Sequence, residues 1–288
     1  YPYLLPSIEP DFSVYPNYKL FQNWNKSKKI PIYYRSFYSL LNQSKNLYHF
    51  IDGTVQLELK KNIYIQNDFQ IGNGMFLNQH FDGYIPYSTR GWGGYLSSSS
   101  INFFQSDGFF TIGNGNLYAN PFNSSLLINA NIPSYRYLYW HQKNENFKFD
   151  WALIFLDNMN KLNRLISLHR YEYSKKFWKI GFSEIALVSY KQIGNDEIEY
   201  ILPSSIFLES EVNGALNSNL MWCFDLSIKF SEYTIMSEIL IDDISLDGES
   251  PNRIAFQVIV GKGGGEGQKY YIKYTRLNRW VGNYYYSD

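Results

Sequence analysis

Apolar and polar residues alternate along most of the chain beyond about residue 30, and this period of two is typical of β-strands. The clearest example is LMWCFDLSIKF at 220–230, where every second residue from Leu220 to Phe230 is apolar. The residues between them include Asp225 and Lys229. Turn-forming residues recur between such segments, and no segment of comparable length has a helical period. The chain is therefore predicted to be all-β.

The segment TIMSEILIDD at 234–243 has the same alternation and follows 220–230 after a short gap. Only Ser231 and Glu232 separate Phe230 from Tyr233, which is the spacing of a tight hairpin. If Phe230 pairs with Tyr233, the apolar residues of both strands share one face. A slip of one residue would move one strand's apolar set to the other face, so this register is strongly favoured.

The same register sets Asp225 directly opposite Glu238. Two like charges at paired positions destabilise an isolated hairpin. A cation is therefore expected beside them, and an arginine from a neighbouring strand is the first candidate. A bound cation such as calcium is an alternative. A third reading is a pair of catalytic carboxylates that act on a glycan.

Strands with one apolar and one charged face fit two folds. In a soluble β-sandwich the apolar faces pack together, whereas in an outer-membrane barrel they meet lipid. Segment length, aromatic residues at strand ends, and polar faces with charges of both signs favour the barrel. We predict an antiparallel transmembrane β-barrel of about 12 to 18 strands at residues 31–288, complete or incomplete in this chain. An irregular segment at 1–30, periplasmic or a plug, precedes it.

Composition narrows the function. The 288 residues carry no net charge, which gives no electrostatic argument for nucleic acid. Aromatic residues make up 19% of the chain, an excess typical of membrane interfaces and sugar-binding surfaces. One cysteine excludes an intrachain disulfide, and with four histidines it disfavours a zinc site. No metal or cofactor is expected. Because the chain begins at Tyr1, it is expected to be a processed or partial form of a longer product.

Charged residues in the C-terminal half are predicted to form an ion network in the lumen. These residues are Arg170, Glu184, Asp225, Glu238, Asp242, Asp243 and Arg276. By its position in FWKIGFSEIALVSY, Glu184 falls on the apolar side of its own segment. His141 and His169 could serve a nucleophile, but no G-x-S-x-G motif is present and a hydrogen-bonded structural histidine is favoured. The protein is predicted not to be an enzyme.

Two segments resemble the Wzi-like capsule-assembly outer-membrane β-barrels of Bacteroidetes. The first is NRLISLHRYEYSKKFWKIGFSEIALVSYKQ, with an HR pair and a glycine-containing strand that reaches S-E. The second runs from EYILPSSIFLESEVNGALNSNL through the D-L strand to the I-D-D ending. YYIKYTRLNRW and, more loosely, NDFQIGNGMFL resemble other strands of the family. The resemblance spans about 160–280, and 60–90 weakly.

The resemblance implies a many-stranded barrel located in the outer membrane. It implies that the protein binds or anchors a surface polysaccharide without catalysis. The expected partners are the lipid bilayer, a surface polysaccharide and other envelope proteins. A structural subunit of a larger envelope or secretion assembly, and a soluble secreted glycan-acting β-protein, are the alternatives.

Overall fold

In the computed structural model, the described residues are 32–39, 46–73, 92–115, 125–127, 135–159, 162–191, 195–205, 207, 218–243, 253–263 and 269–278. The segment predicted at 1–30 lies outside them. The described residues form thirteen strands and one short helix, and the chain divides into two compact units. Among the described residues, no helix has the length and apolar character needed to cross a membrane.

The N-terminal unit holds five complete strands and the start of a sixth, β6. The five are β1 (Ile32–Ser39), β2 (Asn46–Lys60), β3 (Ile63–Asn73), β4 (Trp92–Phe104) and β5 (Gly108–Gly115). Each of the first four pairs antiparallel with the next strand along the chain. The local order is therefore a meander, which needs only hairpin connections.

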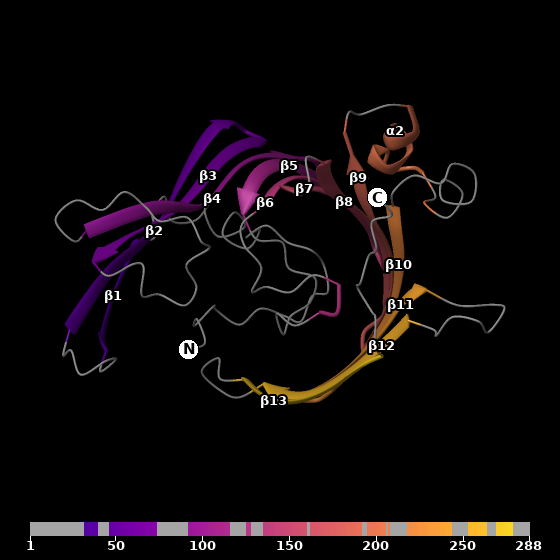
Figure 1. Ribbon diagram of the computed structural model, residues 1–288. Helices are drawn as coiled ribbons and strands as arrows, with labels where there is room; N and C mark the ends of the chain where they lie inside the picture. The colour runs from indigo at the N-terminus through magenta and orange to yellow at the C-terminus, as the bar shows by residue number, and fades with distance from the viewer. Residues whose placement is uncertain are drawn as a thin grey trace. The chain divides into compact units, whose positions relative to one another are not determined.

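The C-terminal unit is also a meander, with seven strands after the end of β6 (Tyr135–Asn144). The seven are β7 (Phe147–Met159), β8 (Leu162–Ser174), β9 (Trp178–Tyr190), β10 (Ser218–Phe230), β11 (Tyr233–Asp243), β12 (Arg253–Gly263) and β13 (Lys269–Leu277). Figure 1 shows β9 to β12 side by side in this order, with the short helix α2 (Asn195–Ile201) between β9 and β10 in the chain.

The hairpin of β10 and β11 has the predicted register. Phe230 pairs with Tyr233, and Asp225 pairs with Glu238. The turn closes at Ser231, which has a positive φ of 51°. The favoured two-residue hairpin turns use this left-handed backbone because it matches the twist of the strands. The apolar and turn pattern of this segment was therefore sufficient to predict its pairing.

Burial on β10 and β11 is the reverse of that in a water-soluble sheet. On β10 Asp225 is only 5% exposed, whereas its neighbour Phe224 is 45% exposed. The same alternation continues on β11, where Glu238 is buried and Ile239 is exposed. We call the side that carries Asp225 the polar face and the side that carries Phe224 the apolar face.

The N-terminal unit has the same inverted polarity. Asn102 of β4 is 2% exposed and accepts a hydrogen bond from Thr111 of β5. Ile101, one residue away and on the other face, is 39% exposed and pairs with the exposed Ile112. Two separate sets of strands therefore bury polar side chains and expose apolar ones.

Candidate functional site

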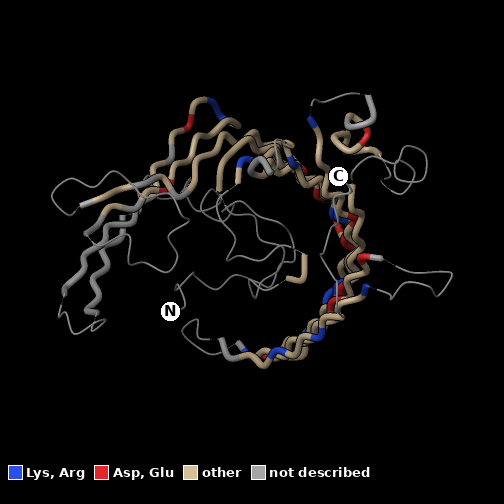
Figure 2. The backbone as a smooth tube through the Cα atoms, viewed as in Figure 1, with Lys and Arg blue, Asp and Glu red and all other residues tan. Residues whose placement is uncertain are grey.

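A row of polar residues crosses the polar face of the C-terminal unit, one residue from each strand. The pairings from β7 to β13 bring together Lys148, Glu172, Gly181, Asp225, Glu238, Gln257 and Thr275. Paired residues project from the same side of a sheet, so these side chains are lateral neighbours. Figure 2 shows acidic and basic residues recurring along β8 to β13. We call this set the polar row.

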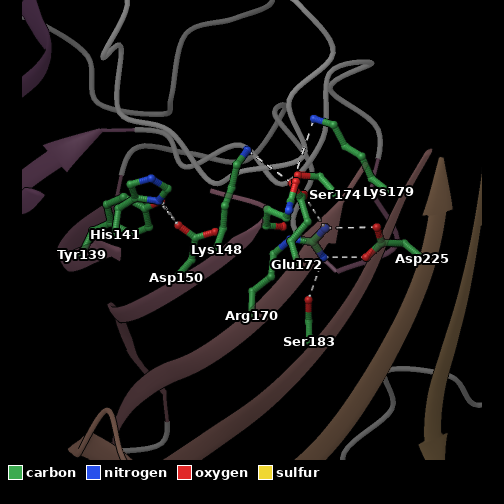
Figure 3. Close-up of polar contacts among 11 residues, drawn as sticks. Tyr139, His141, Lys148, Asp150, Arg170, Glu172, Ser174, Lys179, Ser183 and Asp225 are labelled. Carbon is green, nitrogen blue, oxygen red and sulfur yellow. Dashed lines mark hydrogen bonds and ion pairs between the residues drawn. The ribbon is translucent and has the colours of Figure 1, made fainter. Parts of the chain in front are cut away.

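An arginine lies across the middle of the polar row, as the like-charge argument from sequence required. Arg170 of β8 donates from Nη1 to Asp225 Oδ2 at 2.5 Å and from Nη2 to Asp225 Oδ1 at 3.0 Å. Its Nη1 also donates to Ser183 of β9 at 3.0 Å. Two parallel charge-assisted bonds form the strongest geometry available to an arginine and a carboxylate. Figure 3 shows this pair reaching from β8 to β10.

Gly181 of β9 makes room for that contact. It lies between Glu172 and Asp225 in the polar row. A Cβ atom at Gly181 would overlap Asp225 Oδ2 and would come within 2.5 Å of Arg170 Nη2. Only glycine therefore lets the guanidinium and the carboxylate meet across the intervening strand.

A second acid of the row has cations on both sides. Glu172 Oε1 lies 3.3 Å from Lys148 Nζ, and Glu172 Oε2 lies 3.4 Å from Arg170 Nη2. All three side chains are buried. Buried charges persist only when they are paired, and here Glu172 and Asp225 each lie beside a cation.

A separate cluster surrounds Asp150 of β7, which pairs with Arg170 in register. Asp150 Oδ1 accepts a hydrogen bond from the hydroxyl of Tyr139 at 2.5 Å and lies 2.7 Å from His141 Nδ1. Both partners come from β6 (Figure 3). His141 thus has the structural, hydrogen-bonded surroundings expected from the sequence.

Glu238 and Asp242 are held on the polar face by neutral donors. Glu238 Oε2 accepts from the backbone amide of Leu126 at 2.9 Å and from Gln257 Nε2 at 3.1 Å. Asp242 accepts from Asn219 Nδ2 at 2.8 Å. Glu238 therefore has polar neighbours that differ from those of Asp225, although the two residues are directly paired.

Glu184 does not join the polar row. It pairs with Trp222 and His169, and these positions belong to the apolar face. Its carboxylate accepts from Trp222 Nε1 at 3.2 Å and from the backbone amide of Phe207 at 3.3 Å. Glu184 was predicted to belong to the lumen network, and the structure places it on the apolar face instead. This agrees with its position in the alternation of its own strand.

Arg276 is also separated from the polar row. It pairs with Phe256, which belongs to the row of Phe224 on the apolar face, and its side chain is exposed. Asp243 pairs with Arg253 next to a register shift in β11. The structure thus brings Arg170 and Asp225 together, keeps Glu238 and Asp242 on the same face, and places Arg276 on the other.

Three members of the site were missed from the sequence, namely Lys148, Asp150 and Glu172. Lys148 and Asp150 lie two residues apart in FKFDWA, so they share a face, and Arg170 and Glu172 do the same in HRYEY. That spacing was the available signal. The signal was obscured because every residue of FDWALIFL except Asp150 is apolar.

The described site is a network of buried ion pairs and hydrogen bonds. No group of three or more His, Cys, Asp or Glu suited to a metal occurs among the residues the structure describes. Asp225 is engaged by Arg170 through both of its oxygens. Cys223 is buried and packs with Leu240 and Ala255 as a small filler.

Comparisons with known proteins find similarity among solved structures. No protein-family model matches the chain, and no curated protein matches it. Among solved structures, it is similar to a triple mutant of the Rh. blastica porin. The match has 8% identity and a TM-score of 0.37, and covers 85% of this chain and 94% of that one. The resemblance to the Wzi-like family therefore stays a prediction.

The strands themselves define the class of the protein. In both units the described strands pair antiparallel with their chain neighbours, and β4, β10 and β11 expose apolar side chains on one face and bury polar ones on the other. Lipid requires apolar outer side chains and backbone groups paired between strands. The protein is therefore an antiparallel β-barrel protein of the outer membrane, as the sequence predicted.

Proposed function

We propose that the protein is a non-enzymatic barrel whose polar face is closed by a fixed charge network, so that it serves as an anchor or scaffold in the outer membrane. The observation that carries this proposal is the burial of the network. Arg170, Glu172 and Asp225 are 4%, 1% and 5% exposed. Charges that line an open aqueous channel stay hydrated, whereas these are covered and bonded to one another.

The described part of one loop supports the proposal that the polar face is closed. Leu126 donates its backbone amide to Glu238, and Leu126 and Leu127 pack against the buried Cys223, Leu240 and Ala255. A segment from a connection between strands therefore lies on the polar face. In a barrel this face is turned toward the lumen.

The test combines folding state with conductance. The protein should require detergent or lipid to stay monodisperse, and its electrophoretic mobility should change on heating, as for folded barrels. In a planar lipid bilayer it should show no steady porin-like conductance. Monodispersity without detergent would contradict the barrel, and a steadily open channel would contradict the closed polar face.

Binding of a surface polysaccharide is the second candidate function. The sequence resemblance over 160–280 favours it, and so does the aromatic content of 19%, because aromatic rings stack on sugar rings. Purified polysaccharides from capsulated cells should then be retained by the immobilised barrel in detergent. Retention equal to that of an unrelated barrel of the same size would remove this candidate and leave the scaffold role.

A further inference from the structure

Lysines lie over aromatic rings at the end of the C-terminal unit where the turns are short. Lys175 Nζ is 5.6 Å from the ring centroid of Tyr173, and Lys176 Nζ is 5.2 Å from that of Phe177. On the neighbouring β11 and β12, Lys262 Nζ is 5.3 Å from the ring of Tyr233. These separations are within the range of cation–π contacts. We call these six residues the lysine–aromatic patch.

The hairpins that carry the patch are joined by direct contacts. Lys229 of β10 donates its backbone amide to the carbonyl of Phe177 at 2.8 Å, so the turn of β8 and β9 lies beside β10. The rings of Tyr173 and Trp178 are 5.7 Å apart. Both are exposed, as are Phe177 and Tyr233. These exposed rings therefore lie on neighbouring hairpins at the edge of the apolar face.

The patch has an excess of positive charge. Its acidic neighbour Glu232 lies 3.1 Å from Lys262 Nζ and neutralises that lysine. Lys175 and Lys176 are exposed, and neither has an acidic partner among the described residues. Lys262 itself projects from the apolar face, since it pairs with Tyr233. A lysine tolerates that position where its stem can cover apolar surface and its ammonium can reach the headgroups.

We propose that the lysine–aromatic patch binds the phosphate of an anionic glycerophospholipid. The rings provide the interfacial surface that meets the upper acyl chain, and Lys175 and Lys176 provide the charges that meet the phosphate. This site rests on the outer-membrane class and on no assumption about an open or closed polar face. In barrels the short turns face the periplasm, so the lipid belongs to that leaflet.

The test uses the full chain in detergent, delipidated and then titrated with phosphatidylglycerol or phosphatidylcholine while native mass spectrometry counts bound lipids. Phosphatidylglycerol should bind about tenfold more tightly or better, because each lysine contributes roughly fivefold. The double variant Lys175→Gln/Lys176→Gln should lose that preference. Lys175→Arg/Lys176→Arg should retain it, because charge and ring contact are kept.

The matched control is Arg136→Gln/Lys191→Gln, which removes two exposed cations from the opposite ends of strands. It should leave the preference unchanged. Equal affinity of the unmodified protein for both lipids would overturn the proposal, and so would the same loss in control and test variants. Heat-dependent electrophoretic mobility of every variant shows that its barrel has folded. A missing lipid preference in a folded barrel then contradicts this proposal without contradicting the proposed function.

Discussion

The guanidinium of Arg170 decides whether the polar row is stable. It contacts Asp225 through two hydrogen bonds and lies 3.4 Å from Glu172. Burying several charges is costly, and only their mutual contacts offset the loss of hydration. Arg170 therefore stabilises two acids that the strand pairing forces into the protein interior.

Replacing Arg170 with Met should destabilise the folded barrel by about 3–5 kcal/mol, since Asp225 would stay buried without its cation. The double variant Arg170→Met/Asp225→Leu should lose much less than the sum of the two single changes, because no unpaired charge remains between them. Urea unfolding in lipid vesicles, followed by tryptophan fluorescence, measures these free energies. Additive losses would show that the pair is not coupled.

Gly181→Ala should also weaken the barrel, by roughly 1–3 kcal/mol, because the new methyl group overlaps Asp225 and crowds Arg170. The same change in an Asp225→Ala background should cost less, since the overlapping carboxylate is gone and no longer holds Arg170 against the new methyl group. The same unfolding measurement applies. An equal cost in both backgrounds would mean that Gly181 is needed for backbone reasons and not for the ion pair.

Residue-scale reasoning from the sequence was correct where only one hairpin was involved. The pairing of Asp225 with Glu238 followed from the apolar alternation and the short turn. The arginine beside Asp225 followed from the like-charge argument, but its identity as Arg170 required the registers of β8, β9 and β10 together. Glu184 and Arg276 lie on the other face, because successive side chains of a strand alternate between its two faces. The predicted network did not take this alternation into account.

At the scale of elements, α2 and the residues after it cover a polar cluster on the apolar face. Phe207 stacks on His169 with ring centroids 4.3 Å apart and lies 5.7 Å from the ring of Tyr200 in α2. Its backbone amide donates to Glu184. This cover explains how a histidine and a glutamate can lie on a face that elsewhere exposes apolar side chains.

Phe207→Ala should detach α2 from the strands, because it removes both ring contacts and a fully buried side chain. Amide hydrogen exchange in 195–201 should rise by roughly tenfold or more, while exchange in β8 to β10 changes little. Ile198→Ala is the control, since Ile198 is exposed. If both variants exchange alike, Phe207 does not secure the helix.

At the scale of the whole molecule, the connections divide by length. Within the C-terminal unit the turns at 145–146, 175–177 and 231–232 are short, whereas the two long connections, 191–217 and 244–252, both lie at the other ends of the strands, together with the two-residue connection 160–161. Outer-membrane barrels have short periplasmic turns and longer extracellular loops. The end that carries Lys191 is therefore expected to face outward.

This orientation can be read by labelling cysteines on intact cells. Cys223 is buried and is first replaced by Ala. Lys191→Cys should then react with a membrane-impermeant maleimide on intact cells, and Lys175→Cys should react only after the outer membrane is permeabilised. Both lysines are exposed, so access to the side chain is matched. The reverse labelling pattern would show that the end carrying Lys175 faces outward.

The sequence by itself determined the all-β class, the pairing of β10 with β11, and the presence of an apolar and a polar face. These features depend on alternation and turn length, which are local properties of the chain. Only the tertiary structure decided that the polar side chains are buried and the apolar ones exposed, because both arrangements have the same period. It also decided which cation meets Asp225, since Arg170 reaches it across a strand and through the space left by Gly181.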